Sequence, residues 1–361
     1  MYKFTKISQA DIPWDKIESC YDSTCFHSRQ WHQYLNKIGH RTFVVSIECE
    51  NETIGYFVGE CSGFIFKIVS APMSNSGTYT MGLTMTQNIT ESKRITIYKS
   101  FANWLFVNNY AHLLQIDDWQ LRRTSEDWIP YEDFHHDVLE ENGIKYTIRP
   151  TLCAKVNTSI EEMWSKLHYK SCKYSINKAK RNGLYVKQIT NVEEIDEFVE
   201  IHYSQLTEVC KKQGMRPMPS QRKNRMKILC ESLFPNRVLM LEVIGNDDNG
   251  KEQVMSSGIF AIDKGQCSYW TGASYQRYQK YCPNELMVWE AMSMIYNLGG
   301  GELNFGGMAT YKLKFGTVYE YVPRFNFAKY NWLTQIRPTI KKIYNRLRSI
   351  IARIKGRKSF K

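Results

Sequence analysis

The chain has 361 residues, of which 43% are hydrophobic and 23% are charged, with a formal net charge of +12 at pH 7. This length accommodates two domains of ordinary size, each able to bury its own core. No apolar run approaches the roughly 18 residues that cross a bilayer, and no apolar signal-peptide core follows the N-terminus, which predicts a cytoplasmic protein.

Hydrophobic periodicity predicts alternating helices and strands in the first half of the chain. Trp31, Tyr34, Leu35 and Ile38 share one face of the first expected helix, and Trp31 is expected in the core. The expected helices are 28–38, 92–108 and 131–142, and the expected strands are 41–49, 53–69, 111–116 and 144–156.

The second half shows the same order of elements. Its expected helices are 159–182, 192–212, 219–233 and 284–298, and its expected strands are 237–245, 253–263, 266–273, 301–305 and 318–328. Because this order occurs twice without residue-level identity, the sequence predicts an α/β (α+β) fold of two duplicated domains. We place them at 1–155 and 156–333, followed by a tail, 334–361.

The basic character of the chain belongs to this tail. Residues 334–361 contain ten Lys and Arg and no Asp or Glu, so residues 1–333 carry only +2 of the +12. Apolar residues spaced by three and four from Ile336 to Ile354 predict a basic amphipathic helix. We expect it to lie on an anionic membrane surface. Docking onto the protein body and contact with transfer RNA are the alternatives.

The cysteines and histidines do not form a metal motif. There is no Cys-x-x-Cys pair, no zinc-like cluster, and no His-Glu-x-x-His around the pair His135-His136. We therefore expect reduced, buried or half-buried thiols and no metal. The ten cysteines are Cys20, Cys25, Cys49, Cys61, Cys153, Cys172, Cys210, Cys230, Cys267 and Cys282.

Five ordered segments of the second half resemble motifs of the Fem family of aminoacyltransferases and related GNAT acyltransferases, including those named after a cellulose-synthesis protein. The resemblance is good over about 159–330 and loose over 20–120. The segments are Lys173-x-x-Ile176-x-x-Ala179-x-x-x-Gly183, Tyr269-Trp270-x-Gly272-Ala273, Pro283 with the helix from Leu286 to Ala291, Asn304-Phe305-Gly306-Gly307, and Tyr311-Lys312-x-x-Phe315-Gly316.

This resemblance implies two tandem GNAT-like domains with mixed sheets, the second holding the acyl donor, with the acceptor in the cleft between them. It leaves acyl-CoA and aminoacyl-tRNA open as donors. Lys173, Asn304 and Tyr311 stand where the family usually has Arg, Asp and Phe. Lys173 lacks the bidentate fork of arginine, and Asn304 supplies no carboxylate for a general base.

The donor side is assigned to the end of the second half. The loop from Gly272 to Cys282 occupies the place of a Gly-rich pyrophosphate segment, but its residues 274–280 include no glycine, so a tight coenzyme A cradle is not predicted. Its basic residues could hold a phosphate or a transfer-RNA end, and a solvated loop is the alternative. The candidate donor-binding residues are Arg277, Lys280, Asn304, Gly306, Gly307 and Phe315.

Lys312 is the first candidate for a catalytic residue because it matches the family motif and follows a glycine pair. Its ammonium could hold the acyl-donor carbonyl or a nearby phosphate as negative charge develops. The alternative is a surface lysine covering Phe315. Tyr269 is the second candidate, with a cleft-facing hydroxyl or a ring packed in the sheet as its two readings.

The acceptor side is assigned to the end of the central strand of the first half. Asp118 is the third catalytic candidate and Asp117 an acceptor contact, with helix capping as the alternative. Trp119 and Lys173 complete the acceptor-binding set. No nucleophilic triad is present, which favours direct attack by the acceptor amine.

These features predict a cytoplasmic N-acyltransferase, peripheral on the inner face of the cell membrane. It transfers an acyl or aminoacyl group to an amine of a cell-envelope glycan or peptidoglycan precursor, lipid-linked or nucleotide-linked. Two alternatives stay open: a coenzyme-A-dependent acyltransferase on a soluble amino sugar, and a non-catalytic GNAT-like module that binds a glycan or RNA.

Overall fold

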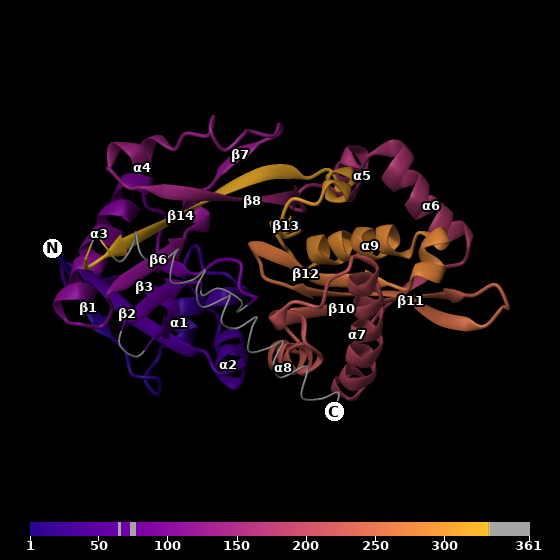
Figure 1. Ribbon diagram of the computed structural model, residues 1–361, viewed down its shortest axis with the longest axis horizontal. Helices are drawn as coiled ribbons and strands as arrows, with labels where there is room; N and C mark the ends of the chain where they lie inside the picture. Colours follow the sequence, from indigo (N-terminus) through magenta and orange to yellow (C-terminus); the bar gives the residue numbers. More distant parts are fainter. Residues whose placement is uncertain (64–65, 73–76, 331, 333–361) are drawn as a thin grey trace, which may run out of the picture.

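The computed structural model describes residues 1–63, 66–72, 77–330 and 332, and one mixed sheet runs through both halves of this part of the chain (Figure 1). The first-half strands are β1 (Tyr2–Lys6), β2 (Arg41–Cys49), β3 (Glu52–Ser62), β4 (Ile68–Ala71), β5 (Gly82–Met85), β6 (Leu113–Asp117), β7 (Arg123–Ser125) and β8 (Tyr146–Lys155). The second-half strands are β9 (Tyr185–Gln188), β10 (Val238–Asn246), β11 (Glu252–Ala261), β12 (Gln266–Ser274), β13 (Glu302–Asn304) and β14 (Val318–Ala328). The expected mixed α/β class is confirmed.

Helices flank this sheet on both faces. Trp270 and Ala273 of β12 belong to the same core as residues of α7 and α8, whereas Cys267 and Tyr269 pack with α9, so these helices cover opposite faces. The α-helices of the described residues are α1 (Trp14–Glu18), α2 (Arg29–Lys37), α3 (Glu91–Val107), α4 (Asp137–Glu141), α5 (Ile160–Lys166), α6 (Tyr174–Arg181), α7 (Ile195–Lys212), α8 (Lys223–Leu233) and α9 (Pro283–Asn297).

Three expected elements need correction. The strand expected at 53–69 is two strands, β3 and β4, which pair antiparallel with each other. The helix expected at 131–142 is only α4, because the chain before it forms turns. The helix expected at 159–182 breaks after α5, since Leu167 is extended (ψ 138°) and the His168 side chain caps a new π-helical turn.

The two halves exchange strands. The order along the sheet is β1-β2-β3-β4-β6-β14-β8-β13-β12-β11-β10-β9, with β5 on β3 and β7 on β14. The last strand, β14, therefore lies between β6 and β8 of the first half, while β8 also pairs with β13 of the second half. The sheet is therefore continuous across the expected domain boundary at residue 155. The division into two domains at this residue stays a prediction.

Each half contains one parallel strand pair, β4 with β6 and β12 with β13, joined through α3 and α9 respectively. The β12–β13 pairing covers only 266–268 against 302–304. From Tyr269 onward the strand β12 continues without β13 beside it, because the chain turns away after Asn304. This divergence opens the sheet at the place where the sequence motifs gather.

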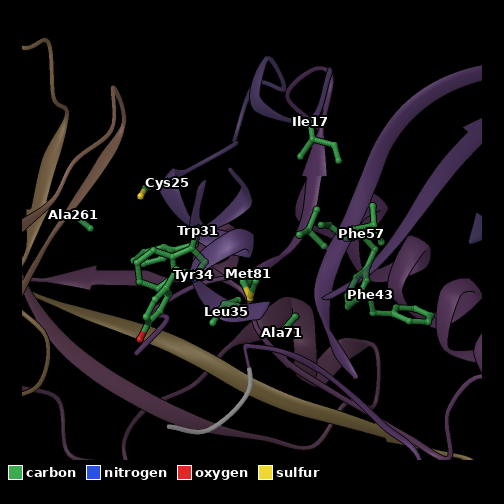
Figure 2. Close-up of a cluster of buried hydrophobic side chains, with 14 of the residues drawn as sticks. Ile17, Cys25, Trp31, Tyr34, Leu35, Phe43, Phe57, Ala71, Met81 and Ala261 are labelled. Carbon is green, nitrogen blue, oxygen red and sulfur yellow. The ribbon is translucent and has the colours of Figure 1, made fainter. Parts of the chain in front are cut away.

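A shared apolar core fixes the halves against each other (Figure 2). Trp31 of α2 has an exposed fraction of 0%, and its Nε1 donates to Thr78 Oγ1 at 2.9 Å. Met226 and Leu229 of α8 belong to the same core. The prediction that Trp31 is a core residue is confirmed.

The described residues also bear on the expectations for the cysteines and for membrane-spanning helices. All ten cysteines are free thiols, seven buried and three partly buried, which confirms the expected thiol state. No helix of the described part is long and apolar enough to cross a bilayer. The tail 334–361, expected to form an amphipathic helix, lies outside the described residues.

A buried charge network fastens α3 to the sheet. Arg94, with an exposed fraction of 4%, donates from Nη1 to Asp22 at 2.7 Å and from Nε to Asp118 at 2.5 Å. Its Nη2 donates to the Leu83 carbonyl at 2.6 Å. Tyr98 Oη donates to the same Asp118 carboxylate at 2.6 Å. One guanidinium therefore compensates two buried carboxylates.

Replacing Arg94 with Met is expected to lower the free energy of unfolding by roughly 3–5 kcal/mol, because two buried carboxylates lose their cation. Arg123→Met is the matched control: its partner Glu91 and Arg123 itself are 33% and 29% exposed, so the expected loss is about 1 kcal/mol or less. Urea unfolding followed by circular dichroism measures both. Equal losses for the two variants would contradict the structural role given to Arg94.

Candidate functional site

Two cavities flank the loop that follows β13. The interdomain cavity, of about 390 Å³, is lined by Tyr79, Trp119, Tyr131, Ile148, Arg149, Pro150, Thr151, Asn304, Gly307, Met308 and Val322. The β12–α9 cavity, of about 290 Å³, is lined by Val209, Gln213, Tyr269, Gly272, Ala273, Ser274, Gln279, Asn284, Glu285, Val288, Tyr311, Lys314 and Phe315. The Asn304–Gly307 segment thus borders one cavity, and the turn Thr310–Phe315 borders the other.

Asn304 shapes the loop between the cavities. Its Oδ1 accepts hydrogen bonds from Thr151 Oγ1 at 2.7 Å and from the Gly306 N–H at 2.8 Å. Gly306 and Gly307 follow with φ of +64° and +69°, a region that favours glycine. A Cβ on Gly306 would lie 2.7 Å from Tyr79 Oη, so the first half of the chain approaches this backbone closely.

Lys312 lies beneath the same loop. Its side chain is buried, with a residue exposure of 8%, and Nζ donates to the Phe305 carbonyl at 2.8 Å and also to the Gly306 carbonyl. No carboxylate among the described residues forms an ion pair with it. Burial lowers the pKa of Lys312 to about 8. This burial does not fit the surface-lysine alternative. Lys312 itself lines neither cavity, although its neighbours Tyr311 and Lys314 line the β12–α9 cavity, and its catalytic role stays a prediction.

Tyr269 packs in the sheet and also lines the β12–α9 cavity. Its ring stacks on Phe260, with 4.9 Å between centroids, and lies edge-on to Phe305 at 5.9 Å. Burial raises the pKa of Tyr269 well above its usual value, which keeps the phenol neutral. The Tyr269 carbonyl accepts from Tyr79 Oη at 3.5 Å. The ring thus packs in the sheet, as one alternative expected, while the cleft-facing hydroxyl stays a prediction.

Asp118 occupies a structural position. It is 2% exposed, pairs with Arg94, and its Oδ1 accepts from the Gln120 N–H at 2.9 Å. It lines neither the interdomain cavity nor the β12–α9 cavity. The geometry therefore favours the capping alternative over a catalytic carboxylate. Asp117 is also fully buried, behind the wall of the interdomain cavity, where it pairs with two arginines.

The two basic residues of the loop after β12, Arg277 and Lys280, do not line the β12–α9 cavity and contact other side chains instead. Arg277 stacks on Tyr275 and Tyr278, with 4.7 Å from its guanidinium carbon to each ring centroid. Lys280 pairs with Asp248 at 2.5 Å. These contacts favour the alternative of a solvated loop over a phosphate grip.

The other assigned residues separate into two groups. Phe315 lines the β12–α9 cavity, where its ring stacks on Phe305 at 5.5 Å. Trp119 lines the interdomain cavity and donates from Nε1 to Glu302 at 3.1 Å. Lys173 lines neither cavity, and its Nζ donates to the Ser165 carbonyl at 3.0 Å. Asn304 and Gly307, assigned to the donor, instead border the interdomain cavity.

The start of α9 does not fit the diphosphate of coenzyme A. The loop before it forms the 3₁₀ turn Gln276–Tyr281, and the Gln276 N–H already donates to Glu208 at 2.8 Å. Pro283 has no N–H to offer, and Glu285 places a carboxylate in the first turn, paired with Lys314 at 2.5 Å. A diphosphate at this helix terminus would lack the N–H of residue 283 and would lie beside a carboxylate whose counter-ion, Lys314, is already engaged.

Sequence reasoning missed the residues that the first half and β14 bring to this place. None of Tyr79, Arg149, Thr151 and Arg324 had a motif around it. The pairing of β8 with β14 brings Arg149, Thr151 and Arg324 together, and Tyr79 comes from the irregular chain before β5. No group of three His, Cys, Asp or Glu in the described part of the chain is placed to hold a metal ion.

Comparison with known proteins concerns the domain family and the fold. Residues 167–314 match the family model of the acetyltransferase (GNAT) domain, so this part of the chain is a GNAT domain. The fold is similar to the crystal structure of FemX, with 10% identity and a TM-score of 0.68 over 92% of this chain and 99% of that one. No curated protein matches the sequence. The expected resemblance is confirmed for the GNAT domain and the fold.

A conserved protein of unknown function from Bacteroides thetaiotaomicron is also similar in fold. It shares 9% identity and a TM-score of 0.54 over 90% of this chain and all of that one. At such identities the likeness concerns the fold alone.

Replacing Gly306 with Ala is expected to lower the free energy of unfolding by roughly 1–3 kcal/mol, through positive-φ strain and a clash with Tyr79. Gly307→Ala is the matched control, because its φ is also positive but no atom of the described residues lies within 4 Å of the new Cβ. Thermal unfolding of both variants measures the difference. A Gly307→Ala loss as large as that of Gly306→Ala would remove the close approach of Tyr79 as its cause.

Proposed function

We propose that this GNAT-domain protein is an N-acyltransferase that moves an acyl or aminoacyl group to an amine of a cell-envelope glycan or peptidoglycan precursor. The observation that carries the proposal is Lys312, a buried ammonium without a paired carboxylate among the described residues. It is held by two backbone carbonyls of the loop between the cavities. The interdomain cavity is proposed for the acceptor and the β12–α9 cavity for the acyl donor.

The chemistry needs few protein groups. The neutral acceptor amine attacks the donor carbonyl carbon, the C–N bond forms, and the carbonyl oxygen becomes negative. The ammonium of Lys312 stabilises this charge from a site of low exposure, where such stabilisation is strong. Breakdown of this tetrahedral intermediate re-forms the carbonyl and breaks the bond to the leaving oxygen or sulfur. The leaving group takes the proton that the amine loses.

The choice of donor rests on the start of α9. The Glu285–Lys314 pair and Pro283 disfavour a diphosphate there, which supports an aminoacyl ester over acyl-CoA. The acceptor class rests on the resemblance of the motifs to the Fem aminoacyltransferases. Attachment to the inner face of the membrane through 334–361 is part of the same proposal, because it would bring a lipid-linked acceptor and the enzyme into one plane.

Acyl transfer assays with the full chain test this function. Aminoacyl-tRNA, acetyl-CoA and a nucleotide-linked amino-glycan precursor are the substrates, with product detected by mass spectrometry. We expect transfer from aminoacyl-tRNA and a loss of roughly 100-fold or more in turnover for Lys312→Met. Lys93→Met, on the exposed face of α3, is the charge-matched control and keeps full activity. Transfer from no donor, or full activity of Lys312→Met, would overturn the proposal.

The pH dependence of turnover gives a second test. Because the pKa of Lys312 is lowered to about 8, the ammonium is lost as the pH rises through that value, and turnover is expected to fall above about pH 8. Lys312→Arg stays cationic, so this falling limb moves to higher pH. The unfolded chain binds the Lys312 proton more tightly than the folded chain does. The free energy of unfolding of the wild type, relative to that of Lys312→Met, therefore rises with pH above about 8. An unchanged limb in Lys312→Arg would contradict the assignment.

A further inference from the structure

Three adjacent strands place a charged cluster on the wall of the interdomain cavity. Asp117 ends β6 and is fully buried. Its Oδ1 accepts from Arg324 Nε at 2.6 Å, and its Oδ2 accepts from Arg324 Nη2 at 2.7 Å and from Arg149 Nη1. Arg324 lies opposite Asp117 in the β14–β6 register, and Arg149 lies opposite Val322 in the β14–β8 register.

In this cluster the positive charges outnumber the negative charges by one. Two guanidiniums share a single carboxylate, and no Asp or Glu is among the described residues that line the cavity. The Arg149 side chain is 41% exposed and lines the cavity, whereas Asp117 is 0% exposed behind it. A guanidinium that uses one nitrogen on a buried carboxylate keeps the rest of its fork for a second oxyanion.

The neighbouring polar groups are also donors. The Oδ1 of Asn304 already accepts from Thr151 and Gly306, which orients the amide so that its NH₂ end is the group left for a ligand. Asn304 lines the same cavity as Arg149. Trp119 and Tyr131 supply aromatic walls. The cavity therefore combines an apolar body with hydrogen-bond donors and one excess cation.

We infer that Arg149, held by Asp117 and beside Arg324, binds a singly charged oxyanion of the acceptor, a carboxylate or a phosphodiester, in the interdomain cavity. The acceptor is then an amine that also bears this anion, so the cluster selects zwitterionic amines over neutral or purely cationic ones. The inference rests on the proposed use of the interdomain cavity for the acceptor. A single excess charge matches a monoanion.

Ligand-observed NMR titration of the full chain tests this selection with three amine probes. N-acetyl-lysine carries a carboxylate, glycerophosphoethanolamine carries a phosphodiester, and N-acetyl-lysinamide carries no anion. We expect at least one anionic probe to bind about 10-fold more tightly than the amide, and the tighter of the two identifies the source of the oxyanion. Equal binding of all three by the wild-type chain overturns the inference.

Variants separate recognition from a merely structural ion network. In Arg149→Gln the preference for the anionic probe is expected to fall to about 2-fold or less. Arg149→Lys keeps the charge without the fork and retains an intermediate preference; it also serves if Arg149→Gln does not fold. Arg181→Gln, on α6 and stacked on Tyr174, is the charge-matched control and binds as the wild type does. A preference unchanged in both Arg149 variants shows a structural network only and overturns the inference.

The same variants distinguish this inference from the proposed function. If the wild-type chain transfers no acyl group but keeps an Arg149-dependent preference for the anionic probe, the function fails and the oxyanion site stands. If transfer proceeds equally well to anionic and neutral amines and is unaffected by Arg149→Gln, the site fails and the acyltransferase stands.

Discussion

The separation of β12 from the chain that follows β13 is the constraint on which the site depends. Only three residue pairs join the two parallel strands, and after Asn304 the backbone enters two consecutive positive-φ glycines. Backbone carbonyls that would otherwise serve a sheet ladder become free to accept from Lys312. The divergence thus creates the β12–α9 cavity and, at the same time, provides the groups that hold a cation beside it.

A buried ammonium without a paired carboxylate is unfavourable by itself, so the surrounding structure must hold it in place. The exchange of β14 into the first-half sheet and the core shared by α2 and α8 provide that support. Tyr79, from the first half, lies against Gly306 and therefore limits the movement of the loop above Lys312. The two halves together hold this loop in place. A loop between two independently moving domains would not be held in this way.

The sequence could predict the elements with strong local signals and the motifs of the second half. The helix α9 begins at Pro283 and ends before three glycines, and Asn304 to Gly307 and Lys312 do converge on one loop. It could not predict which residues of the first half and of β14 meet them, because Arg149 and Arg324 come together only through the strand exchange. It also could not predict that Asp117 and Asp118 lie in different charge environments.

The contrast between these two aspartates shows how one dipeptide serves two environments. Successive residues at the end of a strand point to opposite faces. Asp118 faces α3, where one arginine compensates Asp118 and Asp22 together, so no positive charge is left over. Asp117 faces β14 and β8, where two arginines share one carboxylate and a guanidinium reaches the cavity. In the proposed oxyanion site, the carboxylate that matters is therefore the one that orients an arginine, and its own burial is what keeps that arginine in position.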